Sequence, residues 1–191
     1  GRIEARLRQE FPGLTVRVQA AGIVEGEGIV ARGVSITAPA LPPHCRQLVW
    51  IDELALACGT DLTELTGGQP RITAVRIRRP TVHAQRSADG RWSLAPLVRR
   101  PSGSAAVPVT VEDGTLMIED AGSRSRVALR QIALAVDPSA AGDAEAGAVV
   151  RGTCSGDLFD RLGFEGRLTP ASGGFVVAGT VDALELSPRL T

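Results

Sequence analysis

The chain has 191 residues with 21 basic and 21 acidic side chains, so its formal net charge is zero. That length can bury a hydrophobic core in one or two domains, and a neutral chain has no overall field to attract nucleic acid. Hydrophobic residues make up 43% of the chain but aromatic residues only 3%, which favours a core of branched aliphatic side chains, the kind enriched in strands. We therefore expect a globular protein with no nucleic-acid partner.

The first residues, Arg2–Glu10, predict a short helix, because Ile3 and Leu7 are four positions apart among charged residues. From Leu14 onward apolar and polar residues alternate, which is the pattern of a strand with one buried face. The predicted strands are 14–19, 29–37, 47–58, 71–87, 107–111, 116–118, 126–136, 148–155, 162–169 and 175–186. Single helical turns are expected at 60–65 and 94–98.

The predicted fold has roughly ten strands, and fewer than about a fifth of its residues are in helices. This strand content is far above the usual one. Turn signals separate them throughout, so we predict an all-β, mainly antiparallel meander. No βαβ unit or glycine-rich phosphate loop is present, which argues against nucleotide binding. The segment 99–106 (RRPSGSAA) has linker composition. It divides the chain into a unit at 1–98, which includes the N-terminal helix, and a continuing β unit at 107–191.

Two strands change the phase of their alternation. Val75 and Ile77 are odd-numbered, whereas Val82 and Ala84 are even-numbered. A bulge at Arg78–Arg79 would keep all four on one face of the sheet. A similar slip falls between residues 129 and 132. Residues 112–114 (Glu-Asp-Gly) predict a tight hairpin turn between the short strands on either side of them.

Residues 48–94 carry a more specific pattern, LVWIDELALACGTDLTELTGGQPRITAVRIRRPTVHAQRSADGRWSL. An apolar strand is followed by a loop, by a strand of the form I-x-x-V-x-I-x-x-P, and by the turn Asp89-Gly90 with Trp92 and Leu94. This pattern resembles AsmA-like proteins, relatives of TamB. The stretch VPVTVEDGTLMIEDAGSRSRVALRQIALAVDP also resembles the next hairpin of that family.

The resemblance implies a long, strongly curved sheet that forms an open groove lined by aliphatic side chains, as in bridge-like lipid-transfer proteins. It also implies a location on the periplasmic side of the inner membrane and a role in moving phospholipid toward the outer membrane. No apolar run approaches the roughly 20 residues that span a bilayer, and the chain opens inside an amphipathic segment. We therefore expect the membrane anchor to lie outside this fragment.

A groove of this kind needs no catalytic residue and no cofactor, since acyl chains gain about 0.8 kcal/mol for each buried methylene. The aliphatic sides of several separate strands are expected to form one face that accepts acyl chains. The residues predicted to line it are Leu54, Leu56, Val75, Ile77, Leu116, Ile118, Leu134 and Val136.

Candidates for other chemistry are few. Cys45, Cys58 and Cys154 are expected to be small buried side chains, although one disulfide or a metal site with His44 or His83 stays open. No nucleophile elbow accompanies the two histidines, so we expect no enzyme. The acidic pairs 112–113 and 119–120 fit turn chemistry better than a calcium or acid–base site. Trp50 and Trp92 are expected to be packing anchors.

A locally basic region, formed by Arg78, Arg79, Arg86, Arg91, Arg99 and Arg100, fits either a solvated outer face or contacts with phospholipid headgroups. Two functions remain. One is a lipid-binding or lipid-conducting groove module. The other is a structural β module that pairs through its edge strands with neighbouring domains or a partner chain.

Overall fold

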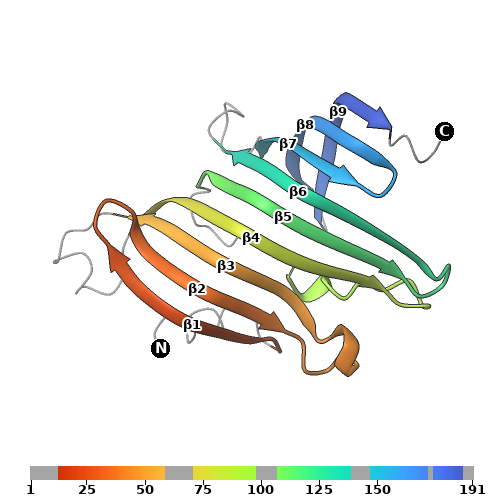
Figure 1. Ribbon diagram of the computed structural model, residues 1–191, viewed down its shortest axis with the longest axis horizontal. Coiled ribbons are helices and arrows are strands. Elements are labelled where there is room, and N and C mark those ends of the chain that lie inside the picture. Colours follow the sequence, from red (N-terminus) through yellow and green to blue (C-terminus); the bar gives the residue numbers. More distant parts are fainter. Residues whose placement is uncertain (1–12, 59–70, 98–106, 139–146, 172–173, 187–191) are drawn as a thin grey trace.

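The computed structural model describes residues 13–58, 71–97, 107–138, 147–171 and 174–186. These residues form one sheet of nine strands whose order across the sheet follows the chain (Figure 1). The strands are β1 (Thr15–Val24), β2 (Gly28–Thr37), β3 (Gln47–Cys58), β4 (Ile72–Arg86), β5 (Val109–Asp120), β6 (Ser125–Asp137), β7 (Ala148–Gly156), β8 (Phe159–Ala171) and β9 (Gly174–Leu186). Within these ranges the helical elements are two 3-10 turns, Pro43–Cys45 and Ala95–Leu97.

The prediction of an all-β, mainly antiparallel meander is confirmed. The expectation of strong curvature is not met, because β1 and β9 stay apart as the two edges of a sheet that neither closes nor curls strongly (Figure 1). The predicted N-terminal helix, the helical turn at 60–65 and the linker at 99–106 lie outside the described residues. The sheet itself runs on from β4 to β5.

The pair β4–β5 is parallel, unlike every other neighbouring pair in the sheet. Parallel neighbours require a crossover that returns the chain to the same end of the sheet, and this crossover runs from the end of β4 to Pro108. Its described part packs Leu94 and Leu97 against the buried cluster of the sheet. The pattern of alternating residues does not predict this parallel pair.

The predicted hairpin at residues 112–114 is wrong. Strand β5 runs through these residues without a turn, so the two short strands expected here are one and the described sheet has nine strands. Asp113 has a left-handed backbone, with φ 54°, and Gly114 is buried. An Asp-Gly step that tolerates a left-handed backbone serves a hairpin turn or a kink within a strand equally well.

Left-handed residues recur close to one transverse level of the sheet. Gly33, Arg79, Asp113 and Gln131, on β2, β4, β5 and β6, have φ values of 61°, 46°, 54° and 51°. The flanking pairs Arg32–Glu53, Glu53–Arg78 and Arg78–Glu112 put the first three of these residues at the same level. We call this line the kink row. The mutual register of β2, β3 and β4 continues through this level without a shift.

The kink row reverses the alternation of side chains between the two faces. Ile77 and Val82, on either side of Arg79, both pack against the same buried cluster despite their opposite parity. The predicted phase change at Arg78–Arg79 is therefore confirmed for this pair, but the predicted bulge is wrong, since the register of β4 with β3 and β5 runs through these residues without a shift. At the row itself, two consecutive side chains of β4 point to the other face.

The buried core lies under β1, β2 and β3. Leu48 and Val16 are completely buried there. The cluster consists of Leu14, Val16, Ala31, Val34, Ala38, Leu48, Val49 and Ile51. Small and branched aliphatic side chains fill it without any aromatic ring, as the composition predicts.

Candidate lipid-binding face

The eight residues predicted to line an acyl-chain site occupy β3 to β6, and the strand register decides which of them share a face. Leu54 pairs with Ile77, and Ile77 is linked through Val111 to Leu134. Directly paired residues in neighbouring strands point to the same side of a sheet. One transverse row of branched side chains therefore crosses four strands.

A second row lies two residues further along each strand. Leu56 pairs with Val75, and Val75 is linked through Val109 to Val136. Since successive side chains alternate between faces, residues two apart on one strand share a face. Six of the eight predicted residues thus lie on one side of the sheet.

The remaining two, Leu116 and Ile118, lie beyond the kink row. They pair with Val82 and Ala84 of β4. Because Val82 packs against the same cluster as Ile77, these pairs belong to the same face as the first six residues. We call the side of the sheet that carries all eight residues the apolar face.

The apolar face is covered unevenly. All eight predicted residues are half-buried, in contrast to the fully buried cluster under β1 to β3. At the edge, Ile23 of β1 is 59% exposed. Apart from the two 3-10 turns, no strand or helix of the described residues lies outside the sheet. A contiguous apolar patch on a protein surface is a candidate site for a ligand or a partner.

Two aromatic rings limit the open part of this face on the β7–β8 side. A Cβ on Gly152 would lie 2.7 Å from the ring of Phe164, its cross-strand neighbour, and 3.2 Å from Leu134. A Cβ on Gly156 would lie 2.8 Å from the ring of Phe159. Each ring therefore fills the space above a glycine on the β7–β8 side of the apolar face.

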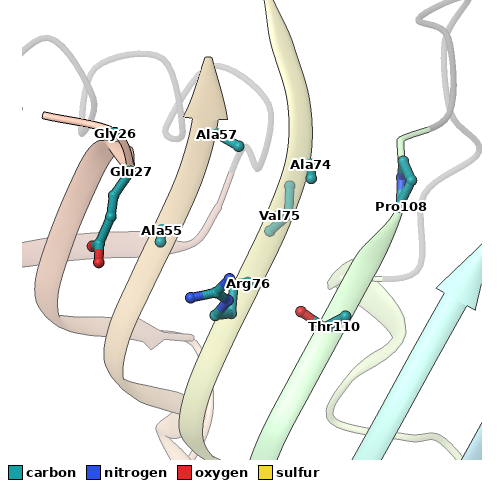
Figure 2. Close-up of a pocket in the computed structure, with 9 residues that line it drawn as sticks. All are labelled: Gly26, Glu27, Ala55, Ala57, Ala74, Val75, Arg76, Pro108 and Thr110. Carbon is teal, nitrogen blue, oxygen red and sulfur yellow. The ribbon is translucent and has the colours of Figure 1, made fainter. Parts of the chain in front are cut away.

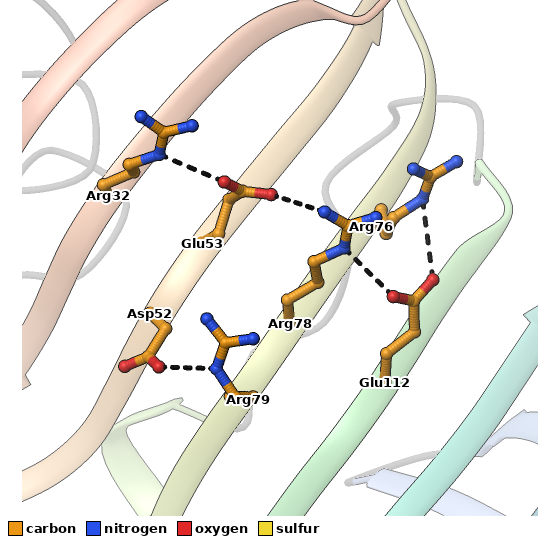
Figure 3. Close-up of polar contacts among 7 residues, drawn as sticks. All are labelled: Arg32, Asp52, Glu53, Arg76, Arg78, Arg79 and Glu112. Atoms are coloured by element: carbon orange, nitrogen blue, oxygen red, sulfur yellow. Dashed lines mark hydrogen bonds and ion pairs between the residues drawn. The ribbon is translucent and has the colours of Figure 1, made fainter.

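The opposite face carries the charges. Figure 3 shows a ladder of ion pairs across β2 to β5 at the kink row. Glu53 accepts hydrogen bonds from Arg32 at 3.1 Å and from Arg78 at 3.0 Å, and Arg78 also binds Glu112 at 3.0 Å. The hydrogen bond from Arg32 is the main cause that lowers the pKa of Glu53. We call this side of the sheet the polar face.

A second group on the polar face centres on Asp52. Its carboxylate accepts hydrogen bonds from Arg79 at 2.8 Å and from the indole of Trp50 at 2.7 Å. These two bonds, that of Arg79 first, lower the pKa of Asp52. Arg78 and Arg79 are thus engaged by carboxylates on the face away from the aliphatic rows, and Trp50 has a structural partner.

A shallow hollow of about 260 Å³ lies on the polar face beside this ladder (Figure 2). It exists because Ala55, Ala57 and Ala74 leave space where their neighbours carry long side chains. Arg76 lies at the middle of the hollow and Glu27 at its rim (Figure 2). Val75 contributes to its lining although its side chain belongs to the apolar face. Sequence reasoning gave no indication of this hollow.

The residues considered for catalysis and metal binding do not come together, apart from His44, whose side chain lies outside what the structure describes. Cys45 and Cys154 are buried, Cys58 is half-buried, and all three are free thiols. Burial raises the pKa of the Cys154 thiol, which makes it a poor nucleophile. His83 is exposed on β4. In the ranges that the structure covers, no group of three or more His, Cys, Asp or Glu side chains could hold a metal ion.

The two acidic pairs have structural partners. Glu112 belongs to the ladder, and Glu119 forms an ion pair of 3.2 Å with Arg126. Asp120 accepts hydrogen bonds from the backbone N–H groups of Gly122 and Ser123, and these bonds lower its pKa.

No profile of a known protein family matches the chain, and no curated protein matches it. Among the described residues there is no helix with the length and apolar character to cross a bilayer.

Proposed function

We propose that this chain is an AsmA-like module of the bacterial envelope that binds or conducts phospholipid acyl chains on its apolar face. The module would work on the periplasmic side of the inner membrane, held there by a membrane anchor. It would serve the lipid homeostasis of the outer membrane and needs neither catalysis nor a cofactor. The resemblance of residues 48–94 to AsmA-like proteins is the reason for proposing a location in the envelope.

One observation carries the proposal. Aliphatic residues on β3 to β6 form continuous transverse rows that are only half-buried, while the charged residues of the kink row point to the other face. Burial of an acyl chain against such a surface is favourable by roughly 25 cal/mol for each Å² of apolar surface removed from water. Binding of this kind selects for hydrocarbon and leaves the chemistry of the ligand unchanged.

The test uses two substitutions at neighbouring positions of β6. Leu134→Asp places a carboxylate in the aliphatic row, where its desolvation opposes acyl binding. Ala135→Asp adds the same charge one residue away at an exposed position on the polar face. Phospholipid retained by each purified protein is measured by native mass spectrometry, and acyl contact is measured by photo-crosslinking from Ile77.

We expect wild-type protein and Ala135→Asp to retain phospholipid and Leu134→Asp to lose at least about nine-tenths of it, the loss that corresponds to 1.4 kcal/mol. Circular dichroism confirms that both variants keep the sheet. If the wild-type protein shows no bound lipid and no crosslinks, the proposed acyl-chain binding is wrong.

The second candidate is a structural module that pairs through its edges. Both β1 and β9 have a neighbour on one side only, and an unpaired edge is a template for strand addition. A lipid-free protein that associates through these edges, detected by crosslinking of β1 or β9 to a partner strand, would favour this function.

A further inference from the structure

A polar row closes one end of the apolar face. In β4 the positions 82, 84 and 86 share a face, so Arg86 follows Val82 and Ala84 on the apolar side. Arg86 pairs with Asp120 of β5, and Asp120 pairs with Ser125 of β6. The crossover from β4 to β5 begins directly after Arg86.

The crossover adds an aromatic side chain to this row. Trp92 forms an antiparallel bridge with Arg86, so the two side chains are neighbours on the same face. The indole is 45% exposed, whereas Leu94, two residues later, packs against the buried cluster. Exposed tryptophan next to aliphatic surface is typical of the boundary between hydrocarbon and water.

Arg86 forms an ion pair but keeps hydrogen-bond donors for a ligand. Its Nη1 atom lies 3.5 Å from the Asp120 carboxylate, and its side chain is 48% exposed. Asp120 is itself fixed, since its other oxygen accepts the turn N–H groups at 2.8 Å and 3.3 Å. A guanidinium has five N–H donors, so most of them remain available to a ligand.

The opposite end of the face differs. Strands β3 to β6 meet there at Cys58, Ile72, Val109 and Asp137, and the aliphatic row through Leu56 and Val136 runs close to that end. Asp137 lies on the polar side, one residue after Val136. Within the described residues, the Arg86–Asp120 pair is thus the only pair of opposite charges that the strand register places on the apolar side of β4 and β5.

We infer that Arg86 and Trp92 form the headgroup end of the acyl site and that Arg86 binds the phosphodiester of a glycerophospholipid. The inference rests on the proposed function and names its ligand class and orientation. Guanidinium and phosphate oxygens match in a two-pronged geometry. The Asp120 carboxylate beside the guanidinium favours a singly charged phosphodiester over a doubly charged phosphate monoester.

The experiment compares two acyl-labelled fluorescent probes with identical acyl chains, a phosphatidylglycerol and a diacylglycerol, in transfer from vesicles to the protein. Arg86→Gln removes the charge of the proposed headgroup contact. Arg126→Gln is the matched control, because Arg126 also forms an ion pair with a strand carboxylate, that of Glu119. Arg126 lies on β6, one position from the polar row. Its side chain is 61% exposed and belongs to the polar face.

Wild-type protein and Arg126→Gln should prefer the phospholipid over the diacylglycerol. Arg86→Gln should lose roughly tenfold in phospholipid affinity, the effect of one charge-assisted hydrogen bond, and keep its diacylglycerol affinity. Arg86→Lys, which keeps the charge but not the planar fork, should fall between them.

Equal loss of both probes in Arg86→Gln, or no loss of either, overturns the headgroup assignment and leaves the acyl site standing. A wild-type protein that accepts neither probe overturns the acyl site and the headgroup assignment together.

Discussion

At the scale of single residues, the fit between Gly152 and its neighbours shows how tightly one side of the apolar face is filled. A Cβ at this position would lie 2.7 Å from the carbonyl oxygen of Ala133 and 2.7 Å from the ring of Phe164. The oxygen belongs to the backbone of β6 and cannot move without breaking the β6–β7 ladder. Gly152→Ala should therefore lower the free energy of unfolding by about 1–3 kcal/mol, as overpacking does.

Gly22 of β1 provides the control for this prediction. No atom lies within 4 Å of the Cβ that an alanine would add there, so Gly22→Ala should leave stability unchanged or raise it by up to about 1 kcal/mol. Urea unfolding of both variants measures the difference. Equal stability of the two would show that Phe164 and β6 yield to the added methyl group.

At the scale of elements, the kink row decides which side chains share a face. Gln131 of β6 is left-handed, with φ 51°, a conformation that disfavours β-branched residues most strongly. Gln131→Val should therefore destabilise the protein by about 1–2 kcal/mol. Gln131→Gly should be tolerated, since glycine adopts this backbone freely.

Ala135→Val on the same strand is the matched substitution, because residue 135 is also exposed but does not have a left-handed backbone. Valine favours an extended backbone, so this variant should be as stable as the wild-type protein in thermal unfolding. A fall of the same size at both positions would mean that the loss comes from the valine side chain and not from the kink.

The kink row also explains what the sequence could and could not reveal. The alternation of apolar and polar residues is visible within a single strand. The sequence therefore predicts the phase change near Arg79 and the slip between residues 129 and 132. The Asp113-Gly114 step wrongly predicts a turn, because a left-handed step has the same sequence signature in a hairpin and in a kinked strand. The parallel pairing of β4 with β5 depends on how the crossover returns, and no local pattern encodes that path.

The register places the predicted lining residues on one face of the sheet, while their contact with lipid stays a prediction. Each was chosen from the aliphatic side of one strand, and register then aligned them into shared rows, such as Leu54 with Ile77. The face of the sheet on which Arg86 and Trp92 lie could not be anticipated in the same way. It depends on the bridge that the crossover makes with β4, and the sequence had grouped Arg86 with Arg78 and Arg79, which lie on the other face.

At the scale of the whole molecule, a single-layer sheet with one aliphatic face is completed by whatever covers that face. Removal of apolar surface from water lowers the heat capacity by about 0.45 cal/mol/K for each Å². A short-chain phosphatidylcholine that covers some 500 Å² should therefore bind with a heat-capacity change near −0.2 kcal/mol/K. It should also raise the Tm with increasing concentration, because it binds the folded state.

Isothermal titration calorimetry at several temperatures, below the micelle concentration of dihexanoyl phosphatidylcholine, measures this change. Leu134→Asp should show a smaller change, since the charge interrupts the row through Ile77, while Ala135→Asp should match the wild-type protein. The same measurement distinguishes the two candidate functions. A structural module that pairs through the edges β1 and β9 and has no acyl site would show a heat-capacity change near zero with lipid, and its Tm would rise with the concentration of its partner chain instead.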